Sequence, residues 1–495
     1  MRVGAHEHGA SGVPGVPGVG SGVGSGRSVG IAPLLVPPRV AARLDPAFRP
    51  SVLARRRAES FLRASVGCEP ATIAVEQPGG SIAVRRTWTL ADEHPDAALG
   101  YWFAERLLKS LLWSRGGCRI LVAGPTGLVD ALRRHYSDDP AGAFDARVMG
   151  DDIYRRPFEI VHVSRDEIPA PRNSTTALGR HLEGCRIGFD LGASDRKVAA
   201  VIDGDVVFSE EVTWDPRRHD DPQWHVDQIM ASLHSAAAHL PRVDAIGGSV
   251  AGVYVDGEVR VSSLFRAVPR DLFERRVRGL FGELRRAWGD VPFVVVNDGE
   301  VTALAGAMMS GVGALLGIAM GSSEAAGYVT ADGRLTGWLN ELAFVPVDYA
   351  PDAPADEWSG DRGCGAQYLS QQAAARLLER AGIDIDPGSS LPERLVRLQE
   401  LLAAGDRRAA DVYATIGTYL GYALLEYRDL YEFEHVLLLG RVLTGEGGEV
   451  IREQARTVLI AEDPSLAEGL AFHEVSERDK RHGQAVAAAS LPPPR

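Results

Sequence analysis

Two stretches of this 495-residue chain share one local pattern, in which an apolar strand ends at small and hydroxyl residues and a second strand returns. The first is "CRIGFDLGASDRKVAAVIDGDVVF", residues 185–208, and the second is "ALLGIAMGSSEAAGYVTADGRL", residues 314–335. Apolar runs on both sides of a short Gly/Ser turn predict a β-hairpin. One such hairpin at the start of each half predicts two α/β lobes of similar layout.

The segments that follow each hairpin alternate between apolar strands and amphipathic helices. This order is typical of a mixed α/β sheet covered by helices. We place the first lobe at residues 185–312 and the second at 313–495, with a ligand-binding cleft between them. In the first lobe, "RDLFERRVRGLFGELRRAWG", residues 270–289, is expected to form one helix.

The first third of the chain has a different composition. Residues 1–40 include a Gly/Val/Pro/Ser tract that cannot build a core, so we expect a disordered tail. Residues 41–170 predict a smaller α/β domain of unknown role, and residues 171–184, rich in turn formers, predict a linker. The run Arg55–Arg57 is expected to form a solvated helix face.

Charge and cysteine usage exclude several classes of protein. The net charge of −13 argues against a general affinity for nucleic acid or for an anionic membrane. Four widely separated cysteines fit reduced thiols in a cytoplasmic protein. The Gly-Lys-Ser/Thr sequence of a Walker loop is missing, so any ATP must be held by another phosphate cradle.

Two carboxylates follow apolar strands of the first lobe. Asp190 ends the opening strand, and Asp298 follows "VPFVVVN", where the periodicity changes to that of a helix. Asp298 could be the N-cap of this helix and nothing more. However, ligands gather at the carboxyl ends of strands in open α/β sheets, which favours a site that brings Asp190 and Asp298 together.

With these motifs in place, the chain resembles the ROK family of sugar kinases and sugar-responsive regulators, within the actin-like ATPase superfamily. The resemblance covers roughly residues 185–490 and implies a two-lobed, ribonuclease H-like fold with ATP and Mg²⁺ bound in the cleft. "IGFDLGAS" is similar to the first phosphate loop, "VNDGEVTALAGAM" to the Asn-Asp strand end, and "GWLNELAFVPVD" to the sugar-binding segment.

The resemblance implies a role for each matching residue. Asp298 is the catalytic base, and Asp190 holds Mg²⁺ through water. The acceptor, a small sugar or polyol, is expected to contact Asn297, Glu341, Ser262 and Ser263. The nucleotide is expected to contact Asp190, Gly192, Ser194, Gly321, Ser322 and Gly440.

The chain departs from the family pattern at several places. The structural zinc site of the family, one histidine and three cysteines, corresponds here to Phe344, Glu357, Ser359 and Cys364. Only Cys364 keeps one of the four family ligands, and neither Phe344 nor Ser359 supplies a substitute, so we expect no zinc. The second phosphate loop has lost glycines and contains Glu324, which would repel a triphosphate unless it points away or binds magnesium.

Three functions remain open from the sequence. The first is an ATP-dependent carbohydrate kinase, for which a homodimer is one expected oligomeric state. The second is a non-catalytic protein that binds a sugar or a nucleotide. The third is a transcriptional regulator, which is disfavoured by the acidic charge and by the lack of a two-helix DNA-binding pattern before residue 185.

Overall fold

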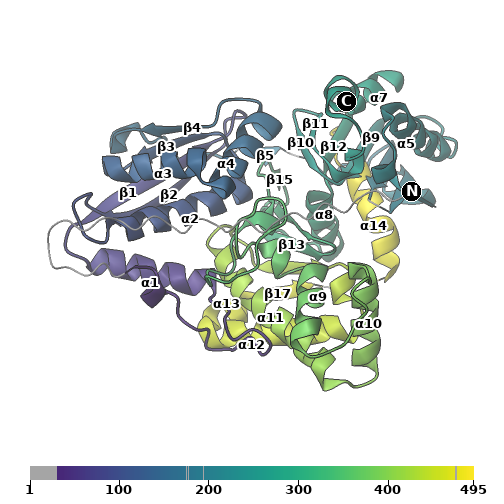
Figure 1. The fold of residues 1–495 in the computed structure, drawn as a ribbon. Coiled ribbons are helices and arrows are strands. Elements are labelled where there is room, and N and C mark those ends of the chain that lie inside the picture. Colours follow the sequence, from purple (N-terminus) through teal and green to yellow (C-terminus); the bar gives the residue numbers. More distant parts are fainter. Residues whose placement is uncertain (1–29, 174, 177, 193, 474–476, 495) are drawn as a thin grey trace, which may run out of the picture.

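A computed structural model describes residues 30–495 except residues 174, 177, 193, 474–476 and 495 (Figure 1). Most of the expected N-terminal tail, residues 1–29, lies outside the described residues. Residues 30–40 belong to the same expected tail, yet Leu34 is buried among Ala58, Leu62, Leu90 and Leu99. Within the described residues, no helix is long and apolar enough to cross a membrane.

The N-terminal region contains a four-stranded sheet in the order β2-β1-β3-β4. The pair β1–β2 is antiparallel and turns at Pro78-Gly79-Gly80. The elements of this region are α1 (Ser51–Ala64), β1 (Cys68–Glu76), β2 (Ile82–Leu90), α2 (Ala97–Arg115), β3 (Arg119–Ala123), α3 (Thr126–Asp138), α4 (Pro140–Arg147), the π-helical turn η2 (Val148–Tyr154) and β4 (Glu159–His162).

The first lobe is built on a five-stranded sheet in the order β12-β9-β6-β7-β8. Strands β6, β7 and β8 are antiparallel neighbours, whereas β9 and β12 run parallel to β6. The elements are β6 (Cys185–Leu191), β7 (Asp195–Ile202), β8 (Asp205–Thr213), α5 (Pro222–Ala237), β9 (Ala245–Val250), β10 (Val253–Val255), β11 (Glu258–Val261), η5 (Ser263–Phe265), α6 (Arg270–Leu272), η6 (Phe273–Val277), α7 (Leu280–Ala287), β12 (Phe293–Asn297) and α8 (Asp298–Ser310).

The second lobe repeats this strand order as β17-β16-β13-β14-β15, with β5 added at the edge. Its first strands are also antiparallel and its last two are parallel to β13. The elements are β5 (Thr175–Thr176), β13 (Leu315–Met320), β14 (Glu324–Val329), β15 (Leu335–Thr336), η7 (Leu342–Phe344), α9 (Gln371–Arg380), α10 (Leu391–Ala403), α11 (Arg407–Arg428), β16 (His435–Leu439), α12 (Glu446–Glu462), α13 (Pro464–Gly469), β17 (Ala471–His473) and α14 (Glu477–Ala489).

The repeated strand order is that of a two-lobed ribonuclease H-like fold, so the predicted fold class is confirmed. Two segments cross between regions. Strand β5 lies in the segment expected as a linker and pairs with β15. Helix α14 lies at the end of the chain and packs on the first-lobe sheet (Figure 1). Gly188 and Gly247 allow this close approach, since a Cβ on Gly188 would lie 1.7 Å from the Ala485 carbonyl oxygen.

One helix prediction was wrong. Residues 270–289 form the short helix α6, the π-helical turn η6 and then α7, in place of one continuous helix. The break falls at Arg278 and Gly279, where the Arg278 amide donates to the carbonyl of Phe273, five residues earlier. Glycine is a poor helix interior residue, which makes it a natural place for the register to change.

Candidate functional site

Asp190 is the last but one residue of β6 and lies at the centre of the first-lobe sheet. The side-chain hydroxyl of Ser249, its neighbour on the parallel strand β9, donates to Asp190 Oδ1 at 2.5 Å. Lys197 is its partner on the antiparallel strand β7, and the lysine Nζ lies 3.8 Å from Asp190 Oδ2. Burial raises the pKa of Asp190 against the opposing effects of Ser249 and Lys197.

Asp298 is the first residue of α8, directly after β12. The N-cap of α8 is Asn297, the residue before Asp298, because Asn297 Oδ1 accepts the Gly299 amide at 2.7 Å. Asn297 Nδ2 donates to the Gly252 carbonyl. Burial first, and the charge of Asp190 second, raise the pKa of Asp298 to about 6. The charge of Asp190 therefore acts on Asp298, and both residues lie at the carboxyl ends of parallel strands.

Glu341 approaches the same place from the second lobe. It precedes η7, and burial followed by the charge of Asp298 raises its pKa to about 7. Its loop is held by the end of α2: the amides of Leu339, Asn340 and Glu341 donate to the carbonyls of Arg115, Ser114 and Trp113 at 3.2, 3.1 and 2.9 Å. The last carbonyls of a helix lack intrahelical donors, and here the backbone amides of this loop act as the donors.

A cavity of about 990 Å³ lies beside Asn297 and Glu341. The first lobe contributes the β10–β11 hairpin and β12, and the second contributes Leu335–Leu339. The N-terminal region adds the β1–β2 turn at Gln77–Gly79 and residues 154–156. Glu300 also lines the cavity, and burial raises its pKa to about 8. Sequence reasoning missed this glutamate, although it lies two residues after Asp298.

The two serines expected at the acceptor are placed differently. Ser262 Oγ donates to the Ala251 carbonyl at 2.6 Å and accepts the Leu264 amide, so this side chain caps η5. Ser263 begins η5, and neither serine is among the residues lining the cavity. The observed geometry gives Ser262 a structural contact.

The expected phosphate loops are tight turns whose first amides are already bonded. The Gly192 amide donates to the Asp195 carbonyl at 3.0 Å, and the Gly321 amide donates to the Ser323 carbonyl at 2.9 Å. The side chains of Ser194 and Ser322 are exposed beside these turns. Gly440 follows β16 with a φ of 106°, and a Cβ there would lie 2.4 Å from the Met320 carbonyl oxygen.

Glu324 does not face the expected phosphate loop. It is buried at the start of β14, where the hydroxyl of Tyr427 donates to its Oε1 at 2.9 Å. Burial raises its pKa to about 8. The Glu324 carboxyl thus points into the second lobe, toward α11.

Of the positions that correspond to the zinc ligands, Phe344 packs on α2. Phe344 stacks on Trp113, Cys364 is buried, and Ser359 donates to Asp356. Close by, the ammonium of Lys109 contacts Asp145 at 2.9 Å and Asp361 at 3.0 Å. Among the residues that the structure describes, no group of three or more His, Cys, Asp or Glu side chains could hold a metal ion.

Magnesium is expected at Asp190, and the residues found there do not fit it as they stand. One oxygen of this carboxylate accepts from Ser249 and the other faces the ammonium of Lys197. A positive charge this close repels a divalent cation. The position of Lys197 could have been predicted from the sequence, because the length of the turn between β6 and β7 sets the register that places Lys197 opposite Asp190.

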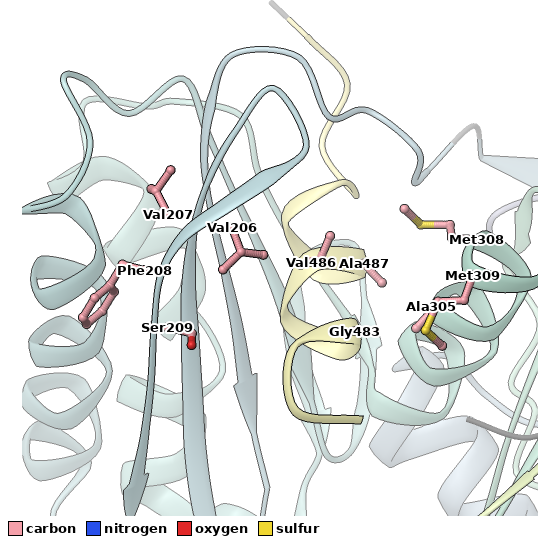
Figure 2. A pocket seen from close by; sticks show the side chains of 10 residues that line it. All are labelled: Val206, Val207, Phe208, Ser209, Ala305, Met308, Met309, Gly483, Val486 and Ala487. Atoms are coloured by element: carbon pink, nitrogen blue, oxygen red, sulfur yellow. The ribbon is translucent and has the colours of Figure 1, made fainter. Parts of the chain in front are cut away.

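A second cavity, of about 640 Å³, lies between β8, α8 and α14 (Figure 2). The side chains around it are mostly apolar, among them Val206, Met308 and Val486, and none of its lining residues is titratable. It therefore lacks the groups needed for proton transfer.

No protein-family model and no curated protein matches this sequence. Several solved structures are similar. A ROK-family glucokinase from Streptomyces griseus, in complex with glucose and AMPPNP, is 21% identical over 62% of this chain and 99% of its own, with a TM-score of 0.48. A ROK hexokinase from Thermus thermophilus is 19% identical over 62% of this chain and 97% of its own, also at 0.48.

A ROK-family transcriptional regulator, a homologue of the E. coli MLC protein, is 20% identical over 63% of this chain and 79% of its own, with a TM-score of 0.49. The solved structures that this chain is similar to thus include both sugar kinases and a regulator of the ROK family.

Proposed function

We propose that this chain is a divergent ROK-type phosphotransferase, which transfers the γ-phosphoryl group of ATP to a hydroxyl of a sugar or polyol. The observation that supports the proposal is a set of carboxyls linked by charge: Asp190 raises the pKa of Asp298, and Asp298 raises that of Glu341. Glu341 and Asn297, the residue before Asp298, line a cavity large enough for a carbohydrate. A carboxyl with a pKa near 6 is largely ionised at neutral pH and can accept a proton.

In this mechanism Asp298 accepts the proton of the attacking hydroxyl. The bond from that oxygen to the γ-phosphorus forms, the bond from the γ-phosphorus to the bridging oxygen breaks, and ADP leaves. Asn297 and Glu341 orient the acceptor from the cavity wall.

The experiment that tests the proposal is a screen of ADP release from ATP and magnesium against a panel of monosaccharides and polyols. We expect at least one acceptor to raise ADP release well above the rate with water alone. A folded protein that releases no more ADP with any acceptor would contradict it.

A second function is favoured by one observation. The amides of Gly192 and Gly321 are bonded within their own turns, which leaves fewer donors for a triphosphate than two open loops would supply. This supports a non-catalytic protein that binds a sugar in the cavity. Isothermal titration separates the two: the kinase gives heat with millimolar ATP, and the sugar-binding protein does not.

A further inference from the structure

Lys197 lies between two carboxylates at the end of the first hairpin. Its Nζ is 3.8 Å from Asp190 Oδ2 and 3.1 Å from Asp195 Oδ1. The side chain is 22% exposed, so it is largely withdrawn from water but remains open on one side.

The charge of Lys197 is fixed by its surroundings. Burial alone would favour the neutral amine, but Asp190 and Asp195 raise its pKa above the usual value. An ammonium group has three N–H donors. Two can face the carboxylates, and the third can reach an acceptor at the open side.

Its position is also the one that a cation would occupy next to Asp190. Ser249 engages Oδ1 of this carboxylate, and Oδ2 faces Lys197. A magnesium ion needs oxygen ligands or their bound water close to its centre and tolerates little distortion. An ammonium group at this place repels a divalent ion electrostatically and occupies the space that the ion and its ligands would need.

We propose that Lys197 is the resident cation of this site: it neutralises Asp190 and Asp195, keeps divalent ions from Asp190 in the free protein, and donates to a phosphate group of the ligand. Only the phosphate contact rests on the proposed function. The exclusion of divalent ions stands on the geometry of the free protein.

The decisive experiment measures binding of Mn²⁺ alone to the full chain by electron paramagnetic resonance, without nucleotide. We expect Lys197→Met to bind Mn²⁺ at least about tenfold more tightly than the unaltered protein, because a positive charge has left a pair of carboxylates. Lys197→Arg keeps the charge and should behave like the unaltered protein. Adding Asp190→Asn to Lys197→Met should remove the gain.

Equal Mn²⁺ affinity in the unaltered protein and in Lys197→Met would overturn the proposal, as would a gain that survives Asp190→Asn. Circular dichroism confirms that each variant is folded. Lys197→Gln is measured in parallel, so that a folding defect of the methionine variant does not decide the result.

Inorganic tripolyphosphate in excess EDTA tests the phosphate contact by calorimetry. We expect the unaltered protein to bind it and Lys197→Met to bind it at least about tenfold more weakly. Absence of binding to the unaltered protein would overturn this part. If both measurements succeed while no acceptor supports ADP release, the proposed function fails and the role of Lys197 stands.

Discussion

The indole ring of Trp113 stacks on the ring of Phe344 with centroids 4.0 Å apart and planes 23° apart. Trp113 lies near the end of α2, in the N-terminal region, and Phe344 lies in η7, three residues after Glu341. The Trp113 carbonyl also accepts the Glu341 amide. The N-terminal region therefore positions a carboxylate of the candidate site.

Trp113→Ala should destabilise the protein strongly. The side chain is buried and its Nε1 donates to Asp145 at 3.0 Å, so the substitution leaves a void and removes one of the hydrogen bonds to this buried carboxylate, which keeps its contact with Lys109. We expect a loss of about 3–5 kcal/mol in the free energy of unfolding, measured in urea. Trp358 is 60% exposed, and Trp358→Ala should change stability by about 0.5 kcal/mol or less. Similar losses for both variants would contradict the stacking contact.

Asp298→Asn should abolish phosphoryl transfer and leave acceptor binding largely intact, because the amide keeps the shape but cannot take the proton. For the unaltered protein, turnover should fall as the pH drops through about 6, where Asp298 becomes protonated. ADP release and calorimetric acceptor binding measure the two effects.

The matched control for Asp298→Asn is Asp290→Asn, a change at an exposed turn, which should leave turnover unchanged. Near-normal turnover of Asp298→Asn would show that Asp298 is not the base and has only a structural role in the first turn of α8.

Glu324→Gln should reduce the pH dependence of stability. The pKa of Glu324 rises from 4.5 to about 8 on folding, so the folded protein holds its proton more tightly than the unfolded chain does. Stability is then greatest below about pH 4.5 and falls as the pH rises toward 8. At pH 8 the glutamine variant should be more stable by roughly 2–4 kcal/mol, a difference that vanishes at low pH.

Urea unfolding at several pH values measures the Glu324→Gln effect. Glu300 and Glu341 share the same direction of shift, so the slope should decrease rather than disappear. Glu453→Gln, on the exposed face of α12, is the control and should leave the slope unchanged. An unchanged slope in Glu324→Gln would argue against a buried, protonated carboxyl.

Gly440→Ala should disturb the junction between β16 and β13. A Cβ at this position would lie 2.4 Å from the Met320 carbonyl oxygen, at a φ of 106°. Gly445→Ala is the matched control, since Gly445 also has a positive φ, 72°, but nothing within 4 Å of the added carbon. Thermal unfolding should show a loss of several kcal/mol for Gly440→Ala and about 1–2 kcal/mol for Gly445→Ala. Equal losses would mean that the junction relaxes without cost.

The sequence predicted the two sheets because their strands are nearly continuous apolar runs between turn residues. Asp190 and Asp298 could be identified because each follows such a run, and strand ends are set by local pattern. Arg55 shows the limit of this reasoning. It was expected on a solvated face, but it is buried and pairs with Glu426 of α11, 371 residues away. Arg56 and Arg57 are exposed, as expected.

Contacts between distant segments account for the remaining differences. The role of Phe344 depends on Trp113, and that of Glu324 on Tyr427, and neither partner can be recognised from a local pattern. Ser262 was assigned by resemblance to a sugar contact, but its hydroxyl is bonded to the backbone of Ala251 and of Leu264. The position of a serine in the sequence does not show whether its hydroxyl will contact a ligand or bond to the backbone.

The three carbonyls at the end of α2 also bear on how the protein can be dissected. A version trimmed to residues 185–495 would lose the acceptors for the amides of Leu339, Asn340 and Glu341. A loss of function in this shorter chain would not show that a regulatory domain had been removed, because the loop that carries Glu341 would have lost its hydrogen bonds to α2 at the same time. The N-terminal region is thus part of the candidate site, and any shortened chain that keeps this loop in place has to include α2.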